Sequence, residues 1–404
     1  MIDHHRLGRE LELFHTDPLV GAGLPIWLPA GAAARHAVEE YIREEERRAG
    51  YQHVYSPPFA KPEMYHRSGH LPSFADDMFP PMADGADELV LRPSLCPHHA
   101  MVYRSRGRSY RELPLRIAEL GGMYRAERSG VLNGLWRVRS IWLNDAHIFC
   151  APEQVPDELS AVLAMMRRAH QALGVQPARF RLSQRGPGGK YVGEPADWDR
   201  SEELLRTALA RAGLEYVEAP GEAAFYGPKI DVQVADAQGR EWSLSTVQVD
   251  LHLPARFELS YVDKDASRRR PVIVHRSVIG SLERLFAYLI EVHDGAFPVW
   301  YAPVQLAVLP VGEAQAAPAK ACAGKAIEAG LRAEVDYDGS LDARIRNAAG
   351  RRVPYVAVIG AREAAAGQVS LRLRHGRRLD PMPAQVAIGL IRDVAERRSL
   401  DLLL

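Results

Sequence analysis

Three groups of arginine and acidic residues in this sequence have the types and spacing to bind a polyphosphate. Arg125 and Glu127 alternate in "MYRAERSG", which predicts a strand with both side chains on one face. Arg137 and Arg139 share a face in "WRVRS", and Arg284 stands near the start of a predicted helix in "GSLERLF". Arginines that converge on one sheet face can each bind phosphate oxygens in pairs. For any single Arg-x-Glu, ordinary surface charge is the alternative interpretation.

A second candidate for chemistry is Cys96, which lies among prolines and histidines in "RPSLCPHHA". A cysteine in this setting can be a nucleophile, a metal ligand or a small core residue. The other two cysteines, Cys150 and Cys322, leave an odd total, which predicts no disulfide framework and fits a reducing compartment. Metal motifs usually place their ligands a few residues apart, and Cys96 has no such partner pattern. The residues alone therefore favour burial in a core.

The elements that must position these residues predict an antiparallel sheet flanked by helices. Residues 229–253 alternate in hydrophobicity and cross a turn at Asp236–Gly239, which predicts a hairpin. Residues 270–293 begin as a strand and become a helix near Gly280. Three further segments predict amphipathic helices: residues 29–49, with Ala34, Ala37, Val38, Tyr41 and Ile42 on one face, residues 151–174 and residues 197–213.

The pattern changes around Pro298–Pro303, where two prolines and several aromatic residues mark a junction. Beyond it, strands and helices alternate, which predicts a small α/β domain. The last helix has an apolar stripe of Ala387, Leu390, Ile391 and Val394. We expect two domains, residues 1–300 and residues 301–404.

Composition sets broad limits on function. The chain has 404 residues, 47% hydrophobic and 25% charged, which is typical of a globular protein. The formal net charge is +0, but a local basic face can hide in a neutral total, so a nucleic-acid partner is neither supported nor excluded. No apolar run approaches ~20 residues, so we expect no membrane contact. The start, "MIDHHRLGRELELF", is charged where a signal peptide is apolar, which predicts a cytoplasmic location.

The three charged groups carry a family resemblance. "MYRAE", "RVRS" and "GSLERL" resemble motifs 2 and 3 of class II aminoacyl-tRNA synthetases, and the helix–strand unit ending in "SPPF" resembles motif 1, which forms the dimer interface in that class. Successive blocks narrow the resemblance to threonyl-tRNA synthetases: "DHHRLGRELELF", "SGHLPSFADDMF", "SYRELPLRIAE", "NDAHIFC", "AFYGPKID", "STVQVDL", "VIVHRSVIGSLER" and, for the anticodon-binding domain, "RRVPYVAVIG". The resemblance runs over nearly the whole chain.

This resemblance implies a fold and a set of partners. The fold is an α+β class II catalytic domain with an antiparallel sheet flanked by helices, followed by a small α/β anticodon-binding domain. The expected partners are threonine, ATP, tRNA and a second copy in a homodimer. Because the resemblance begins where the family's catalytic core begins, we expect the family's N-terminal and editing domains to be absent.

The resemblance also implies one zinc ion per subunit, held by Cys96, His147 and His275. Three ligands leave an open position, as in a catalytic zinc site. In this family the amino group and side-chain hydroxyl of the substrate bind the metal. An unpaired polar site rejects valine by roughly 10⁴ or more, whereas a missing methyl group gives only ~10–200-fold. We therefore expect appreciable activation of serine, or its editing by another protein.

The remaining roles are assigned by matching blocks. Arg125 is expected to hold the α-phosphate of ATP and Glu127 the adenine amino group, while Arg137 and Arg284 neutralise the outer phosphates with Mg²⁺. We count Arg125, Arg284 and His70 as catalytic, His70 because it matches a histidine that assists transfer to the tRNA. The expected substrate-binding residues are Asp145, Tyr226, Lys229, Gln248 and Ser281, with Gln248 also near ATP. The expected anticodon-reading residues are Glu363 and Arg372.

Several departures from the family pattern keep alternatives open. Ser94, Ile141, Leu143, Leu244 and Ser245 stand where the family has other residues, and Asp338 and Asp342 make a normally basic loop acidic. One alternative is a specialised synthetase that activates threonine, serine or another β-hydroxy amino acid for a biosynthetic or resistance role. Another is a catalytically inactive, synthetase-like binding module. His98 is expected to be a surface histidine, or else a partner of a metal ligand.

Overall fold

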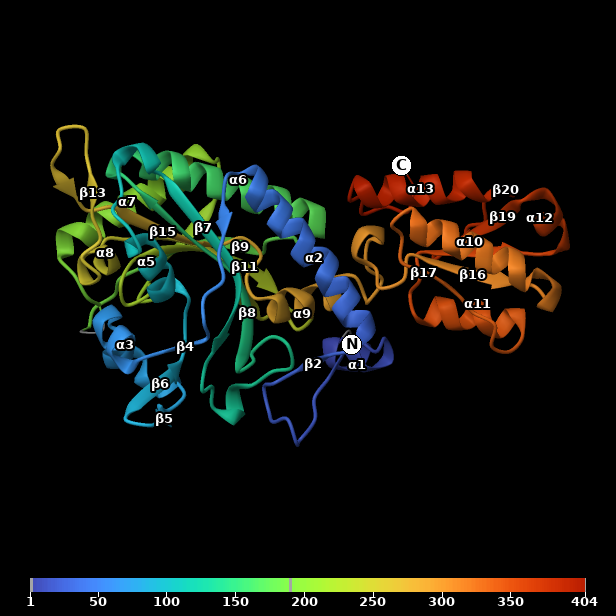
Figure 1. Ribbon diagram of the computed structural model, residues 1–404, viewed down its shortest axis with the longest axis horizontal. Helices are drawn as coiled ribbons and strands as arrows, with labels where there is room; N and C mark the ends of the chain where they lie inside the picture. Colours follow the sequence, from blue (N-terminus) through green and yellow to red (C-terminus); the bar gives the residue numbers. More distant parts are fainter. Residues whose placement is uncertain (1–2, 189–190, 404) are drawn as a thin grey trace.

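A large mixed sheet forms the centre of the first domain in the computed structural model, which describes residues 3–188 and 191–403 (Figure 1). The strand order is β10-β9-β11-β12-β15-β8-β7-β3. Neighbouring strands are antiparallel except at the two edges, where β10 runs parallel to β9 and β3 runs parallel to β7. The strands are β3 Gln52–His53, β7 Leu115–Tyr124, β8 Ser140–Cys150, β9 Arg179–Gln184, β10 Tyr216–Pro220, β11 Lys229–Ala235, β12 Glu241–Asp250 and β15 Val272–Ser277.

Long amphipathic helices contribute to the largest core, which covers one face of this sheet. These helices are α2 Pro29–Arg48, α6 Val155–Leu173, α7 Pro195–Arg211 and α9 Leu282–Val292. All four were predicted from their apolar periodicity, and the structure confirms them. Gly280 precedes α9 at φ +69°, and a Cβ there would lie 2.3 Å from the carbonyl oxygen of Leu244, so the turn into α9 requires glycine.

The other face of the sheet carries shorter elements and a separate small core. Phe149 and Ile273 belong to this core together with Cys96, whereas Ile148 and Val274 belong to the large one. The alternation of side chains along β8 and β15 produces this division. The nearby elements are β4 Phe59–Ala60, α3 Pro62–Ser68, α4 His70–Phe74, β5 Met82–Asp84, β6 Asp87–Leu91, α5 Cys96–Arg104 and α8 His252–Arg256.

Several short elements complete the first domain. They are α1 His4–Glu10, β1 Phe14–His15, β2 Ile26–Trp27, β13 Tyr261–Val262 and β14 Arg268–Arg269, with 3₁₀ turns at Ala75–Asp77, Tyr110–Glu112, Ser129–Val131, Pro152–Gln154 and Val299–Tyr301. The last of these turns packs between α2 and α13, where the two domains meet (Figure 1).

The second domain is a five-stranded sheet of order β17-β16-β18-β19-β20 with helices on both faces. Helices α10 and α13 share one core with the sheet, and residues of α11 pack in another. The elements are β16 Leu306–Pro310, a 3₁₀ turn Glu313–Gln315, α10 Ala316–Glu328, β17 Ala333–Val335, α11 Leu341–Gly350, β18 Tyr355–Ile359, α12 Ala361–Ala366, β19 Gln368–Leu373, β20 Met382–Pro383 and α13 Ala384–Glu396. The alternation of strands and helices was predicted, but the short α12 was not.

One local prediction was wrong. Arg125 and Glu127 do not lie on a strand, because β7 ends at Tyr124. Arg137 and Arg139 likewise precede β8, which begins at Ser140. These four residues lie in the connection between the two strands, whose Arg-x-Glu alternation resembles a strand in the sequence. Among the helices of the described residues, none has the length and apolar character needed to cross a membrane.

Candidate active site

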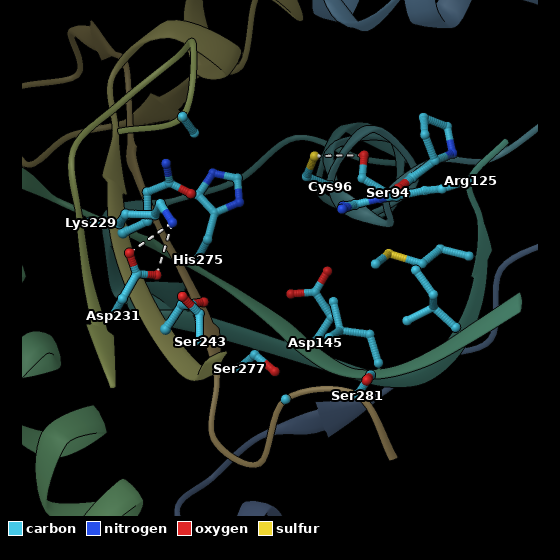
Figure 2. A pocket seen from close by; sticks show the side chains of 18 of the residues that line it. Ser94, Cys96, Arg125, Asp145, Lys229, Asp231, Ser243, His275, Ser277 and Ser281 are labelled. Atoms are coloured by element: carbon cyan, nitrogen blue, oxygen red, sulfur yellow. Dashed lines mark hydrogen bonds and ion pairs between the residues drawn. The ribbon is translucent and has the colours of Figure 1, made fainter. Parts of the chain in front are cut away.

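A cavity of about 610 Å³ opens on the sheet face opposite the long helices. Its lining includes all thirteen residues predicted for ATP, amino acid, metal or catalysis: His70, Cys96, Arg125, Glu127, Arg137, Asp145, His147, Tyr226, Lys229, Gln248, His275, Ser281 and Arg284. Residues more than 200 positions apart in the chain therefore meet in one place. Figure 2 shows Cys96, Asp145 and His275 around the same space.

Three potential metal ligands cluster at one end of this cavity. Cys96 is the first residue of α5, and His147 and His275 are direct neighbours on β8 and β15. One ligand atom from each lies within 4.8 Å of the others, and all three side chains are buried. Sulfur and imidazole nitrogen are the ligands that zinc prefers. We refer to this part of the cavity, Cys96, His147 and His275, as the metal end.

Hydrogen bonds leave one nitrogen of each histidine available to a metal. Nε2 of His275 lies 2.8 Å from a carboxylate oxygen of Asp250, so it carries the proton and Nδ1 is free for a ligand. Nδ1 of His147 lies 2.7 Å from Nδ1 of His99, which leaves Nε2. Metal-binding histidines almost always have such a partner on their second nitrogen. The donor set therefore fits zinc, and the pairing is present without the ion.

Sequence reasoning missed both partners. Asp250 and His99 lie outside the matched metal blocks, although His99 stands one turn after Cys96 on α5, which was a usable signal. The prediction for His98 was wrong in both forms. His98 is buried rather than on the surface, and its Nε2 lies 3.5 Å from the carbonyl oxygen of Phe59 instead of near a metal ligand.

Burial dominates the electrostatics of the metal end. It raises the pKa of the Cys96 thiol, so the free cysteine favours its protonated form. A bound divalent cation reverses this preference because it deprotonates a coordinating thiol. Burial also raises the pKa of Asp145, which lies two residues before His147 on the same strand face.

The expected amino-acid-binding residues surround the metal end. Tyr226 packs against His275 with ring centroids 5.3 Å apart. Lys229 holds both oxygens of Asp231 at 2.8 Å, and Gln248 donates to the carbonyl of Gly227 at 2.9 Å. Ser281 caps α9 by accepting from the backbone N–H of Arg284 at 3.1 Å. Apart from Ser281, a cap of a long helix, these contacts could not be read from the sequence.

A second part of the cavity, which we call the arginine end, consists of Arg125, Arg137 and Arg284. Arg137 pairs with Glu127 at 2.7 Å. Arg284 donates to the carbonyls of Ser243 at 2.7 Å and Trp136 at 3.2 Å. Within the described residues, no carboxylate forms an ion pair with Arg125 or Arg284. Desolvation, with the like charges of Arg125 and Arg137, lowers the pKa of Arg284 to about 10. Uncompensated positive charge in a cavity suits a polyanion.

His70 lies beside the metal end, with its Nε2 3.9 Å from the sulfur of Cys96. Its Nδ1 is 2.8 Å from the hydroxyl of Ser68, and its Nε2 is 2.9 Å from the hydroxyl of Ser94. Burial lowers its pKa to about 3, so the imidazole is neutral and Nε2 accepts from Ser94 while Nδ1 donates to Ser68. Ser94 also lies 3.3 Å from the sulfur of Cys96.

The departures from the family pattern divide into two groups. Ser94, Ile141, Leu143 and Leu244 line the cavity. Ser245 does not, since its hydroxyl bonds His170 and the carbonyl of Val278 on the other face of the sheet. The departures therefore do not all surround the pocket, because neighbouring strand residues point to opposite faces.

The two predicted anticodon residues lie in the second domain, away from the cavity. The carboxylate of Glu363 accepts from the backbone N–H of Gly360 and from the hydroxyl of Ser370, both at 3.0 Å. Arg372 lies on β19, opposite Val356 of β18. The structure gives the two residues a common sheet region but no ligand, so their reading of bases stays a prediction.

Two family models match the sequence. The tRNA synthetase class II core domain (G, H, P, S and T) matches residues 79–293, and the anticodon binding domain matches residues 305–393. The first match alone covers more than half of the chain. The chain belongs to the class II tRNA synthetases.

Similar proteins narrow the comparison for this class II synthetase. It is 49% identical to a threonine–tRNA ligase of Thermus thermophilus over 403 residues, which are 98% of this chain and 61% of that relative. It is 48% identical to a threonine–tRNA ligase of Listeria welshimeri over 394 residues, 95% of this chain and again 61% of the relative. The chain thus spans about three fifths of the length of these relatives.

A solved structure supports the same fold. The crystal structure of the RNA binding domain of threonyl-tRNA synthetase from Cryptosporidium parvum matches with a TM-score of 0.93 and 34% sequence identity. The match covers 99% of this chain and 100% of that chain. The predicted fold class, a class II catalytic domain with an anticodon-binding domain, is confirmed.

Proposed function

We propose that this chain activates threonine with ATP to form threonyl-adenylate and transfers the threonyl group to tRNA. One observation carries the proposal. A cysteine–histidine–histidine donor set lines the same cavity as Arg125 and Arg284, two arginines that form no ion pair within the described residues. The first suits a small amino acid with a hydroxyl group and the second suits a triphosphate, which are the two substrates of this reaction.

The arginine end binds ATP in this proposal. Arg125 holds the α-phosphate, and Arg284 and Arg137 neutralise the outer phosphates together with the Mg²⁺ that accompanies ATP. Glu127, now paired with Arg137, accepts from the adenine amino group. Gln248 lies close to both substrates. These residues contribute by positioning and by neutralising charge that develops on the phosphates.

The metal end selects the amino acid. Cys96, His147 and His275 would hold zinc, which supplies open coordination positions for the amino group and the side-chain hydroxyl of threonine. Asp145 accepts a hydrogen bond from that hydroxyl, Tyr226 and Lys229 line the pocket, and Ser281 fixes the start of the helix that carries Arg284. Valine has the same shape as threonine but offers no hydroxyl, so Asp145 would remain unpaired.

The reaction then proceeds in two steps. A carboxylate oxygen of threonine attacks the α-phosphorus while its bond to the β-phosphate oxygen breaks, which gives threonyl-adenylate and pyrophosphate. A ribose hydroxyl at the end of the tRNA next attacks the carbonyl carbon, and AMP leaves. His70 would accept a hydrogen bond from that hydroxyl through Nε2, in place of the one that it accepts from Ser94. Glu363 and Arg372 contact anticodon bases, and α2 with its neighbouring strand pairs with a second copy in a homodimer.

A second candidate function has its own support. Ser94 and Leu143 line the cavity and replace the residues usual in the family, so the preferred substrate can be serine or another β-hydroxy amino acid in a specialised role. The two candidates share adenylate chemistry and differ in amino acid and acceptor.

One experiment separates these candidates. ATP–pyrophosphate exchange is measured with threonine, serine and valine on zinc-loaded protein, followed by charging of bulk tRNA. The main proposal expects exchange with threonine, some with serine, almost none with valine, and charging of tRNA. Exchange without charging favours the specialised enzyme. No exchange with any of the three amino acids would overturn both and favour an inactive binding module.

A further inference from the structure

A buried chain of hydrogen bonds runs from the metal end into the protein interior. Nδ1 of His147 contacts Nδ1 of His99 at 2.7 Å, and Nε2 of His99 contacts a carboxylate oxygen of Glu119 at 3.2 Å. The other Glu119 oxygen faces Arg92 and the backbone N–H of Ser56, each at 3.2 Å. Four of these residues, His147, His99, Glu119 and Arg92, are at least 96% buried. No motif in the sequence assigns a function to this series of hydrogen bonds.

The positions of the protons along these hydrogen bonds follow from the charge of Glu119. Burial alone would raise the pKa of Glu119, but hydrogen bonds from His99 and Ser56 and the charge of Arg92 lower it to about 2. Glu119 is therefore ionised and can only accept hydrogen bonds. Nε2 of His99 must then carry the proton that it donates to Glu119. Nδ1 of His99 is left as the acceptor for the N–H of His147 Nδ1.

We infer that His99 and Glu119 are positioning residues that hold His147 in the tautomer whose Nε2 lone pair faces the cavity. Glu119 fixes the tautomer of His99, and His99 fixes the tautomer and ring orientation of His147. This inference rests on the proposed zinc site and adds to it a reason why His147 binds through Nε2. The tautomer of His275 is fixed more directly, because its Nε2 contacts the carboxylate of Asp250 with no residue in between.

A single isosteric substitution, Glu119→Gln, tests the chain. Oε1 of Glu119 faces two groups that can only donate, the guanidinium of Arg92 and the backbone N–H of Ser56, so the amide oxygen of glutamine must take this place. The amide nitrogen then faces Nε2 of His99 and the hydroxyl of Ser56, which lies 2.6 Å from the same Glu119 oxygen, and has one hydrogen to donate to each. The donation to His99 moves the proton of His99 to Nδ1. The N–H groups on Nδ1 of His99 and Nδ1 of His147 then point at each other. His147 avoids this conflict only if its proton moves to Nε2, which removes the lone pair on the cavity side.

The readout is the zinc dissociation constant of the full chain, measured by competition with a chromogenic chelator, with the visible spectrum of the Co²⁺-substituted protein as a second measure. We expect Glu119→Gln to weaken zinc binding about 10- to 100-fold. His99→Leu, which removes the acceptor, should do the same. His99→Asn keeps an oxygen near the position of Nδ1 and should restore most of the affinity.

His98→Leu is the matched control because His98 is a buried neighbour on the same helix that contacts no metal ligand. Unfolding curves of the zinc-free variants show any loss of stability separately from affinity. If Glu119→Gln and His99→Leu bind zinc as tightly as the wild type, the contacts are only structural and the inference is overturned. If the wild-type protein itself binds no stoichiometric zinc, the zinc site of the proposed function is overturned, and the positioning roles of His99 and Glu119 are overturned with it.

Discussion

The two ends of the cavity differ in how completely their side chains are paired with other protein groups. At the metal end, the second nitrogen of His147 and that of His275 are held by His99 and Asp250. At the arginine end, Arg284 donates to two backbone carbonyls and lies over the ring of Trp242, but forms no ion pair within the described residues, and its pKa is lowered to about 10. The metal end is therefore preorganised, whereas the arginine end is electrostatically incomplete and depends on its ligand for countercharge.

The largest effect is expected from breaking the metal end. Cys96→Ala removes one of three ligands, so bound zinc should fall far below one per chain and threonine-dependent exchange should drop on the order of 10³-fold, since metal coordination contributes several kcal/mol. Metal analysis and pyrophosphate exchange measure the two quantities. Cys322→Ala is a suitable control because Cys322 is also a free, buried cysteine but lies in the core of the second domain. Full zinc content in the Cys96→Ala protein would contradict the site.

Breaking the arginine end should lower activity and raise stability. Arg284→Met removes a partly desolvated charge that no carboxylate neutralises in the described residues, so the free protein should unfold at a temperature a few degrees higher. Exchange should fall about 10²- to 10³-fold, as for loss of one group that stabilises developing charge. ATP should raise the melting temperature of the wild type more than that of the variant.

Arg139→Met is the control for this experiment. Arg139 belongs to the "RVRS" segment together with Arg137 of the arginine end, but it does not line the cavity, and it donates to the carbonyls of Glu127 and Ala22. We expect it to leave exchange nearly unchanged. A melting temperature of the Arg284→Met variant below that of the wild type would show that the carbonyl contacts of Arg284 stabilise the fold by more than its desolvated charge destabilises it. The contrast between the two ends would then be lost.

The difference between the two ends also explains what could be predicted from the sequence. The helices and hairpins of the first domain follow from local periodicity, and the resemblance identified the residues that line the cavity. The partners of those residues could not be predicted, because His99 and Asp250 are recognised only once β8, β12, β15 and α5 meet. The strand predicted for Arg125 and Glu127 was wrong because alternation of two charged residues is also possible in an extended loop.

The smallest expected effect concerns Glu283, which precedes Arg284 in the chain but faces away from it. Its carboxylate accepts from the backbone N–H of Trp142 at 3.0 Å and lies 3.7 Å from Arg35. Burial raises its pKa from 4.5 to about 7, against the opposing charge of Arg35. The folded protein therefore holds this proton more tightly than the unfolded chain does. Its contribution to stability is fully present below pH 4.5 and is lost as the pH rises through 7.

A shift of this size corresponds to at most about 3 kcal/mol in the free energy of unfolding. Glu283→Gln cannot titrate, so the wild type should lose stability relative to this variant between pH 5 and pH 8, as measured by urea unfolding at each pH. Glu119, which contacts His99 behind the metal end, has its pKa lowered to about 2. Its contribution to the free energy of unfolding should therefore disappear only when the pH falls through the acid range. The two carboxyl groups thus predict opposite pH dependences, one for each end of the cavity. Parallel curves for the wild type and Glu283→Gln across this range would mean that Arg35 keeps Glu283 ionised, and the arginine end would then have a buried negative charge behind it.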